Sequence, residues 1–151
     1  LPQLVERSGN GLNGHGSITA FYTVLAEGDD QQDPIADAAR AILDGHIVLS
    51  RELAESGHFP AIDIERSASR VMHNVADSQH IDDARRFRQL WSRYSKARDL
   101  IQLGAYTPGG DHDLDLAVRL HPHMVNMLQQ DMSTPAHMPD SVGELHQIVS
   151  A

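Results

Sequence analysis

The sequence predicts an α/β layer followed by an all-helical unit. Strand-like and helix-like segments alternate over residues 17–64, which is typical of an α/β layer. Residues 81–103 instead repeat apolar side chains at helical spacing, and the segments that follow also favour helices. We therefore expect two domains, residues 1–77 and residues 78–151, with the boundary near Asp77.

Two buried strands are expected in the first domain. Residues 17–26 and 59–64 are rich in apolar, β-branched and aromatic side chains. The nearly continuous apolar character of the first run is typical of a strand that a parallel sheet buries on both faces. Residues 46–49 favour a third, short strand. Ahead of these, residues 1–7 suit the end of a helix, and residues 8–16, with several glycines, favour a loop.

Two helices are expected between these strands. Asp33 is a predicted N-cap, and Pro34 is the first-turn residue of a helix that runs to about Leu43. A shorter helix is expected over residues 51–55, closed by Gly57.

The second domain is expected to contain three helices. The first carries the apolar stripe of residues 81–103 and ends at Gly104. A turn, a helix that Pro122 kinks or restarts, a loop and a final short helix should follow. The turn, the second helix and the loop are residues 107–111, 114–130 and 132–139, and a capping box at residues 141–144 opens the final helix.

Composition indicates a globular protein. The chain has 151 residues, of which 40% are hydrophobic and 22% charged, and it contains no apolar run of the length that spans a bilayer. Its net charge of −9 argues against nucleic-acid binding. The absence of cysteine and of a secretory leader favours the cytoplasm. Because residues 1–6 lack an initiator methionine and enter directly at a helix, we expect a fragment.

The most informative candidate site lies at residues 59–70. An aromatic side chain precedes a proline at Phe59-Pro60, and Arg70 lies in what is predicted to be a small-residue turn over residues 67–70. An aromatic ring can cover a flat ligand, and an arginine held by a turn can reach a phosphate. From the residues alone, the favoured interpretation of Phe59 is a core residue, and Arg70 could be a surface ion-pair partner.

Other motifs give weaker signals. The glycine-rich loop at residues 9–16 lacks the spacing and the lysine of a phosphate-binding loop. The acidic residues at 27–30 imitate a magnesium-binding strand end, but loop carboxylates are the favoured interpretation. His121 and His123 do not share one helical face, so no metal site is predicted among the histidines.

Several long stretches of this sequence resemble the flagellar and type III secretion ATPases, which are similar in turn to the catalytic β subunit of rotary ATP synthases. These stretches are Gly16–Leu25, Glu27–Asp30 with Asp33-Pro34, Leu43–Arg51, Gly57–Asp63 and Ser67–Met72. Residues 1–72 fit closely and residues 73–151 more loosely. The sequences of residues 29–34 and of the tail 100–106 are closer to those of the flagellar members than to those of the injectisome members.

The resemblance implies a fold and a nucleotide site. The fold is the C-terminal part of a RecA-like P-loop ATPase domain, followed by an all-helical C-terminal domain. The family binds ATP and Mg²⁺ between the subunits of a homo-hexamer. Phe59, with Pro60, falls where the family stacks an aromatic ring on adenine. Residues 132–139, beginning with Met132, fall where the family tail forms the second wall of that pocket, but they depart from its aromatic-containing pattern. Arg70 matches the arginine finger that reaches the γ-phosphate of the neighbouring subunit's ATP.

The resemblance also implies what should lie outside this chain. The phosphate loop, its lysine, the magnesium aspartate and the catalytic glutamate are expected to precede Leu1. We therefore expect that the parent protein hydrolyses ATP to energise flagellar protein export, and that the 151-residue chain alone is inactive.

The implied partners are a stator-like regulator, a central stalk protein and export chaperone–substrate complexes. The implied location is the cytoplasm, peripheral to the inner membrane at the flagellar base, without a transmembrane segment. The turn at residues 107–113 falls where rotary relatives contact their stalk, with Asp111 and Asp113 as its acids. Two alternatives stay open: a non-catalytic helical docking module at residues 78–151, or an injectisome role.

Overall fold

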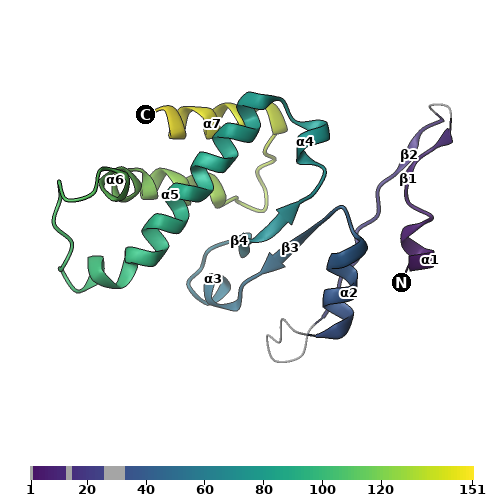
Figure 1. Ribbon diagram of the computed structural model, residues 1–151, viewed down its shortest axis with the longest axis horizontal. Coiled ribbons are helices and arrows are strands. Elements are labelled where there is room, and N and C mark those ends of the chain that lie inside the picture. Colours follow the sequence, from purple (N-terminus) through teal and green to yellow (C-terminus); the bar gives the residue numbers. More distant parts are fainter. Residues whose placement is uncertain (1, 13–14, 26–32) are drawn as a thin grey trace. The chain divides into compact units, whose positions relative to one another are not determined.

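The computed structural model describes residues 2–12, 15–25 and 33–151 (Figure 1). Its contacts divide the chain into two compact units, residues 1–46 and residues 47–151, and each is described by itself. This division by compactness differs from the domain boundary predicted near Asp77, and that boundary stays a prediction. Within the described ranges, every helix is too short or too polar to cross a membrane.

The first unit consists of short elements. They are α1 (Pro2–Val5), β1 (Gly9–Asn10), β2 (Ser17–Ile18) and α2 (Pro34–Ile42). The two strands pair antiparallel, with Gly9 opposite Ile18. The carboxylate of Asp33 accepts hydrogen bonds from the backbone N–H groups of Ile35 (2.7 Å) and Ala36 (3.0 Å), as predicted for the N-cap of α2. This predicted helix is confirmed.

The buried strand predicted over residues 17–26 forms only at its start. Ser17–Ile18 is strand, whereas the residues from 19 to 25 have no strand structure, and Phe21 and Leu25 are almost fully exposed. Residue 26 lies outside the described residues. Within the described part of the chain, β1 alone pairs with this segment, so its apolar side chains have no sheet to pack within. The prediction of a strand buried on both faces is therefore wrong here.

The second unit begins with a two-stranded sheet. The sheet consists of β3 (Gly45–Leu49), whose last three residues open the unit, and β4 (Ile62–Ser69); α3 (Arg51–Glu55) connects them and α4 (Met72–Val75) follows. The strands β3 and β4 run in opposite directions (Figure 1). The backbone N–H of Ser50 donates to the carbonyl of Ala61 at 2.8 Å where the strands meet α3. The predicted strand at residues 46–49 and the predicted helix at residues 51–55 are confirmed.

The strand predicted over residues 59–64 is displaced along the chain. β4 begins at Ile62 and continues through Ser69, so the turn expected at residues 67–70 is strand for most of its length. The hydroxyl of Ser67 accepts from the N–H of Val48 (2.9 Å) and donates to the carbonyl of Asp63 (2.6 Å). This side-chain bridge holds the small residues in the sheet, which their composition alone did not predict.

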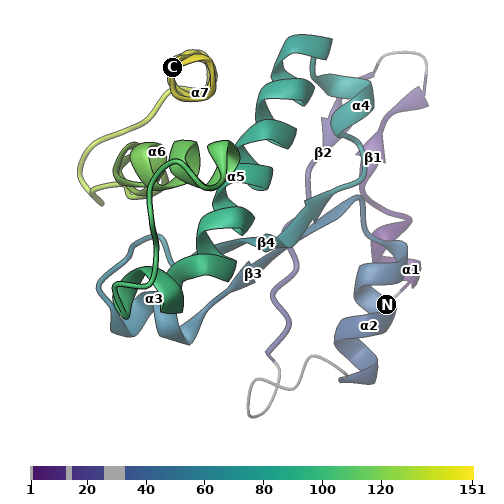
Figure 2. The same ribbon diagram turned by 60° about the vertical axis from the view of Figure 1, so that its left-hand side comes forward.

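Three helices form the rest of the second unit. They are α5 (Ser78–Gln102), α6 (His112–Leu128) and α7 (Met138–Ser150). Helix α5 packs on both α6 and α7, which also contact each other (Figure 2). Leu90 of α5 and Met124 of α6 are almost completely buried at the centre of the core. The other buried core residues are Phe87, Ala117, Leu120, Leu145 and Ile148.

The ends of these helices partly follow the sequence signals. Asp77 caps α5 by accepting from the N–H of His80 at 2.8 Å, and α6 continues through Pro122. The predicted capping box is wrong: α7 begins at Met138, and Ser141 lies within it, where its hydroxyl donates to the carbonyl of His137. A proline in the first turn is compatible with a helix start, so the helix begins before the serine that looked like a cap.

Candidate functional site

Phe59 lies on an exposed loop between α3 and β4. Its side chain leaves 55% of its surface exposed, and the following Pro60 is exposed as well. The Phe59–Pro60 peptide bond is cis. The neighbouring His58 is buried, and its backbone N–H donates to the carbonyl of Leu53 at 2.9 Å. The loop is thus anchored at His58 while the ring of Phe59 stays accessible.

The connection between α6 and α7 is fixed to this loop. The backbone N–H of Gln130 donates to the carbonyl of Phe59 at 2.9 Å. The side-chain amide of Gln130 then donates to the carbonyl of Thr134 at 3.0 Å. Asp131 accepts from the hydroxyl and from the N–H of Ser133, and these bonds hold the pKa of Asp131 below its usual value. Residues 130–134 therefore form a compact lip beside Phe59.

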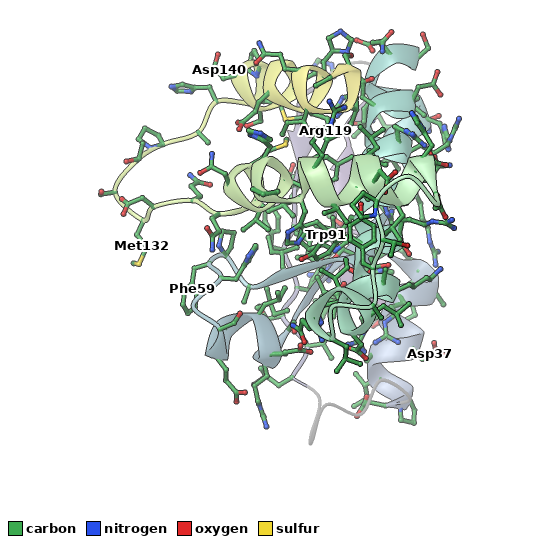
Figure 3. The ribbon with its side chains drawn as sticks, turned by 90° about the vertical axis from the view of Figure 1, so that its left-hand side faces the viewer. Asp37, Phe59, Trp91, Arg119, Met132 and Asp140 are labelled. Atoms are coloured by element: carbon green, nitrogen blue, oxygen red, sulfur yellow. The ribbon has the colours of Figure 1, made fainter. Side chains whose placement is uncertain are left out.

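Met132 lies at the tip of this lip. Its side chain is fully exposed, and Figure 3 shows Met132 and Phe59 at the same edge of the structure. A thioether is flexible and polarisable, and it makes favourable contacts with aromatic groups. An accessible aromatic ring beside an anchored lip fits a flat heteroaromatic ligand such as a purine base.

Arg70 lies at the other end of β4. It follows Ser69, the last residue of the strand, and its side chain is exposed. β4 lies between Arg70 and the loop that carries Phe59, so the two residues stand at opposite ends of the strand. This placement suits two separate ligand sites.

The acids of the α5–α6 turn are engaged with arginines of α5. Asp111 forms a close ion pair with Arg93 and also caps α6 by accepting from the N–H of Leu114 at 3.1 Å. Asp113 pairs with Arg86 at 2.9 Å. The hydrogen bond from Leu114, followed by that from Arg93, lowers the pKa of Asp111, and the Arg86 guanidinium lowers the pKa of Asp113.

A third carboxylate, that of Asp115, hydrogen-bonds to two other residues of the α5–α6 connection. Asp115 accepts from the hydroxyl of Tyr106 at 2.6 Å and from the N–H of Gly109 at 2.8 Å. The bond to Asp115 also raises the pKa of the Tyr106 phenol. The acidic residues of this turn therefore serve first to fix its own conformation.

The weaker sequence candidates gain no ligand role. His121 stacks on Tyr94 with ring centroids 3.5 Å apart, and burial lowers its pKa. Among the described residues, no three histidine or acidic side chains come together as a metal cage. The residues at 27–30, considered for magnesium, lie outside the described residues.

Two features of the second unit could not be found by motif. One is the lip at residues 130–134, because its anchor joins backbone atoms that are distant in sequence. The other is the set of contacts of a buried carboxylate: Asp83 is 5% exposed, one of its oxygens lies 2.9 Å from Nδ1 of His146 on α7, and Gln79 donates to its other oxygen at 2.9 Å. In the sequence, the only sign of these contacts is a polar residue on the apolar face of a helix.

Two family models match the chain in succession. Residues 1–69 match the nucleotide-binding domain of the ATP synthase alpha/beta family, and residues 76–147 match the T3SS EscN ATPase C-terminal domain. The chain is therefore the C-terminal part of a RecA-like P-loop ATPase domain followed by an all-helical C-terminal domain.

Known proteins of two kinds are similar over nearly the whole chain. The flagellum-specific ATP synthase of Pseudomonas aeruginosa is 59% identical over 150 residues, which is 99% of this chain and 33% of that protein. The flagellum-specific ATP synthase of Salmonella typhimurium is 59% identical over 148 residues, 98% of this chain and 32% of that protein. The type 3 secretion system ATPase of Pseudomonas syringae pv. syringae is 46% identical over 150 residues, 99% of this chain and 33% of that protein.

Solved structures agree with these relatives. The assembled ATPase EscN from the enteropathogenic E. coli type III secretion system has a TM-score of 0.93 at 47% identity, covering 98% of this chain and 35% of that one. EscN in complex with its central stalk EscO has a TM-score of 0.86 at 44% identity, covering 98% of this chain and 34% of that one. This chain belongs to the flagellar and type III secretion ATPase family, and it spans about a third of the length of these relatives.

Proposed function

We propose that the parent protein hydrolyses ATP to energise flagellar protein export, and that this chain supplies an adenine-binding lip and a trans arginine finger. The observation that carries the proposal is the placement of an accessible Phe59 and an exposed Arg70 at opposite ends of β4. Two sites so far apart suit a ring in which nucleotide lies between subunits. The proposed domains are residues 1–77, carrying both groups, and residues 78–151, carrying the lip.

Phe59 and Pro60 would hold the adenine of the subunit's own ATP. The exposed ring of Phe59 offers its face for stacking, and the lip at residues 130–134 is fixed against it through Gln130. Met132, at the tip of the lip, would contribute to the second wall. The alternative that Phe59 is a core residue is disfavoured because more than half of its surface is exposed.

Arg70 would face the γ-phosphate of ATP bound to the neighbouring subunit. Negative charge on the transferred phosphoryl group is stabilised by a guanidinium held close to it, and such fingers are worth about 10³–10⁵ in rate in well-studied GTPases. Mg²⁺ and the phosphate chain are assigned to residues outside this chain, as the family resemblance implies. The chain by itself should therefore be inactive.

A homo-hexamer and a set of export proteins complete the proposal. Support for a ring and for a stalk partner comes from the similarity to assembled EscN and to EscN bound to its central stalk EscO. We assign the turn at residues 107–113 to the stalk, with the regulator and the chaperone–substrate complexes as further partners. The protein would work in the cytoplasm, peripheral to the inner membrane at the flagellar base. An injectisome role remains the alternative, since relatives of both kinds cover this chain.

The test is Arg70→Ala in the whole protein. Steady-state turnover should fall by about 10³ or more, because transition-state charge loses its partner. Hexamers should still assemble, which sedimentation velocity measures. Arg66→Ala is the matched control: Arg66 lies on β4, four residues before Arg70, and pairs with Asp63 at 3.9 Å, and its loss should leave turnover nearly unchanged. Near-normal turnover in Arg70→Ala would sink the finger assignment.

A further inference from the structure

A groove along α5 gathers positive charge in a chain that is acidic overall. The groove has a volume of about 850 Å³ and lies between α5, the segment that follows β4 and the start of α6. Of the chain's 12 lysine and arginine residues, five line it, whereas Asp113 is the only acid among its described lining residues. The five cations are Arg85, Arg86, Arg88, Arg93 and Lys96. The chain as a whole carries −9.

Two of these cations have no carboxylate partner among the described residues. The other three form ion pairs within the chain. Arg88 donates instead to a neutral acceptor, the backbone carbonyl of Glu65, at 3.0 Å. Lys96 is exposed. Positions 88, 92 and 96 follow helical spacing, so Arg88 and Lys96 lie on one face of α5 with Ser92 between them. That face presents positive charge that no carboxylate among the described residues compensates.

The groove adjoins the proposed arginine finger. Ser69 and Met72, which flank Arg70 in sequence, both line it. Consecutive Cα atoms are about 3.8 Å apart, so the rim of the groove begins within one residue of the finger. If Arg70 reaches a nucleotide on the neighbouring subunit, then the groove must lie against that subunit too. This step rests on the proposed function.

We propose that the groove receives a carboxylate-rich face of the next copy of the protein in the ring. In a cyclic ring each subunit uses two different surfaces, so a positive groove on one copy can meet a negative surface on the next. A chain of net charge −9 with a concentrated cationic groove suits such head-to-tail pairing. Charge pairs across an interface fix its register and exclude wrong partners. The groove therefore sets the register in which Arg70 meets the phosphate.

The test reverses the two uncompensated charges in the whole protein. Arg88→Glu with Lys96→Glu should raise the concentration for half-assembly by about tenfold or more, because like charges would then face each other across the interface. Sedimentation velocity with a non-hydrolysable ATP analogue and Mg²⁺ measures it. Arg98→Glu is the matched control, because Arg98 lies on the same helix outside the groove and pairs with Glu52 at 3.2 Å. It should assemble like the unchanged protein.

Further measurements separate assembly from folding and from catalysis. A thermal melt of the reversed variant shows whether it folds, and if it does not, Arg88→Gln with Lys96→Gln takes its place. That neutral pair should weaken assembly less and should make it less sensitive to salt than the unchanged protein. Wild-type assembly in the folded charge variants would overturn the proposal. So would retained assembly with loss of an acidic export partner, because the groove would then serve cargo.

Arg70→Ala run in parallel distinguishes the two proposals. If the finger assignment fails, Arg70→Ala keeps its turnover, and the groove proposal loses the support that it takes from the finger. Normal assembly of the charge variants would then overturn the groove proposal as well. If only the groove assignment fails, Arg70→Ala loses turnover while the charge variants assemble normally.

Discussion

Phe59 and Phe87 show how differently one residue type can be used in this chain. Phe87 is 4% exposed in the helical core, whereas Phe59 leaves more than half of its surface accessible next to an anchored lip. Removing Phe87 would leave a cavity, which is a matter of stability. Phe59 has no comparable packing role, so its removal should act on the ligand.

We therefore expect Phe59→Ala to weaken nucleotide binding without unfolding the protein. Stacking on a base is worth about 1–3 kcal/mol by alanine substitution, so the Kd of ATP should rise roughly 5- to 150-fold in the whole protein. Fluorescent-nucleotide titration measures it. Phe59→Tyr keeps the ring and should bind almost as tightly as the unchanged protein. Equal affinity in Phe59→Ala would show that adenine does not stack there.

At the residue scale, the sequence could supply Phe59 and Arg70 as candidates, but it could not supply the groups that support them. Phe59 and Arg70 could be chosen because the family resemblance covers them directly. The groups that hold the lip, Gln130 and Asp131, could not, since their partners are set by the approach of two loops in three dimensions. A motif search compares residues that are close in sequence, whereas Gln130 and Phe59 are far apart in sequence.

At the scale of elements, the α5–α6 turn depends on Asp111 more than on Asp113. Asp111 caps α6 and pairs with Arg93, whereas Asp113 makes only an exposed pair with Arg86. Asp111→Ala should lower the thermal midpoint of the chain by a few degrees, and Asp113→Ala should change it less. Differential scanning calorimetry checks both. A larger loss in Asp113→Ala would contradict this ranking.

The pKa values of Asp111 and Asp113 predict how the stability of the folded protein changes with pH. Their pKa values are lowered in the folded state, so the stability that they contribute is present above the ordinary carboxyl pKa and is lost as the pH falls through the lowered values. Acid should therefore loosen the turn. Asp111→Asn should flatten the acid limb of the stability profile, because an amide does not titrate.

Helices were predicted better than strands. α2, α3 and α5 follow local signals, namely caps, a terminal glycine and an apolar stripe, which depend little on distant residues. The strand expected over residues 17–26 depends on partner strands, and the described residues supply only β1. The capping box in α7 failed for a local reason, since Pro139 already starts the helix before Ser141.

At the scale of the whole molecule, one deletion tests the two roles proposed for the helical unit. Removing residues 78–151 from the whole protein should abolish binding of export chaperones if this unit is their docking site. It should also weaken ATP binding, because the lip at residues 130–134 is lost with it. Basal hydrolysis should stay measurable at saturating ATP. Chaperone binding that survives the deletion would place the docking site elsewhere.

The two-part architecture was predictable because each part has its own pattern. Alternating strands and helices define the first, and the three-helix core around Leu90 and Met124 the second. The pattern could not predict contacts between distant segments, such as the hydrogen bond from Arg88 to the Glu65 carbonyl. Such contacts depend on the final path of the chain and leave no periodic trace.

The bond that joins Gln130 to Phe59 is main chain to main chain at both ends. This hydrogen bond therefore does not depend on the side chains at these two positions, except that proline at position 130 would remove the donor. Met132, the proposed outer wall of the adenine site, can accordingly be replaced while the loop keeps its attachment. The chemistry of that wall can change without loss of the main-chain support beneath it.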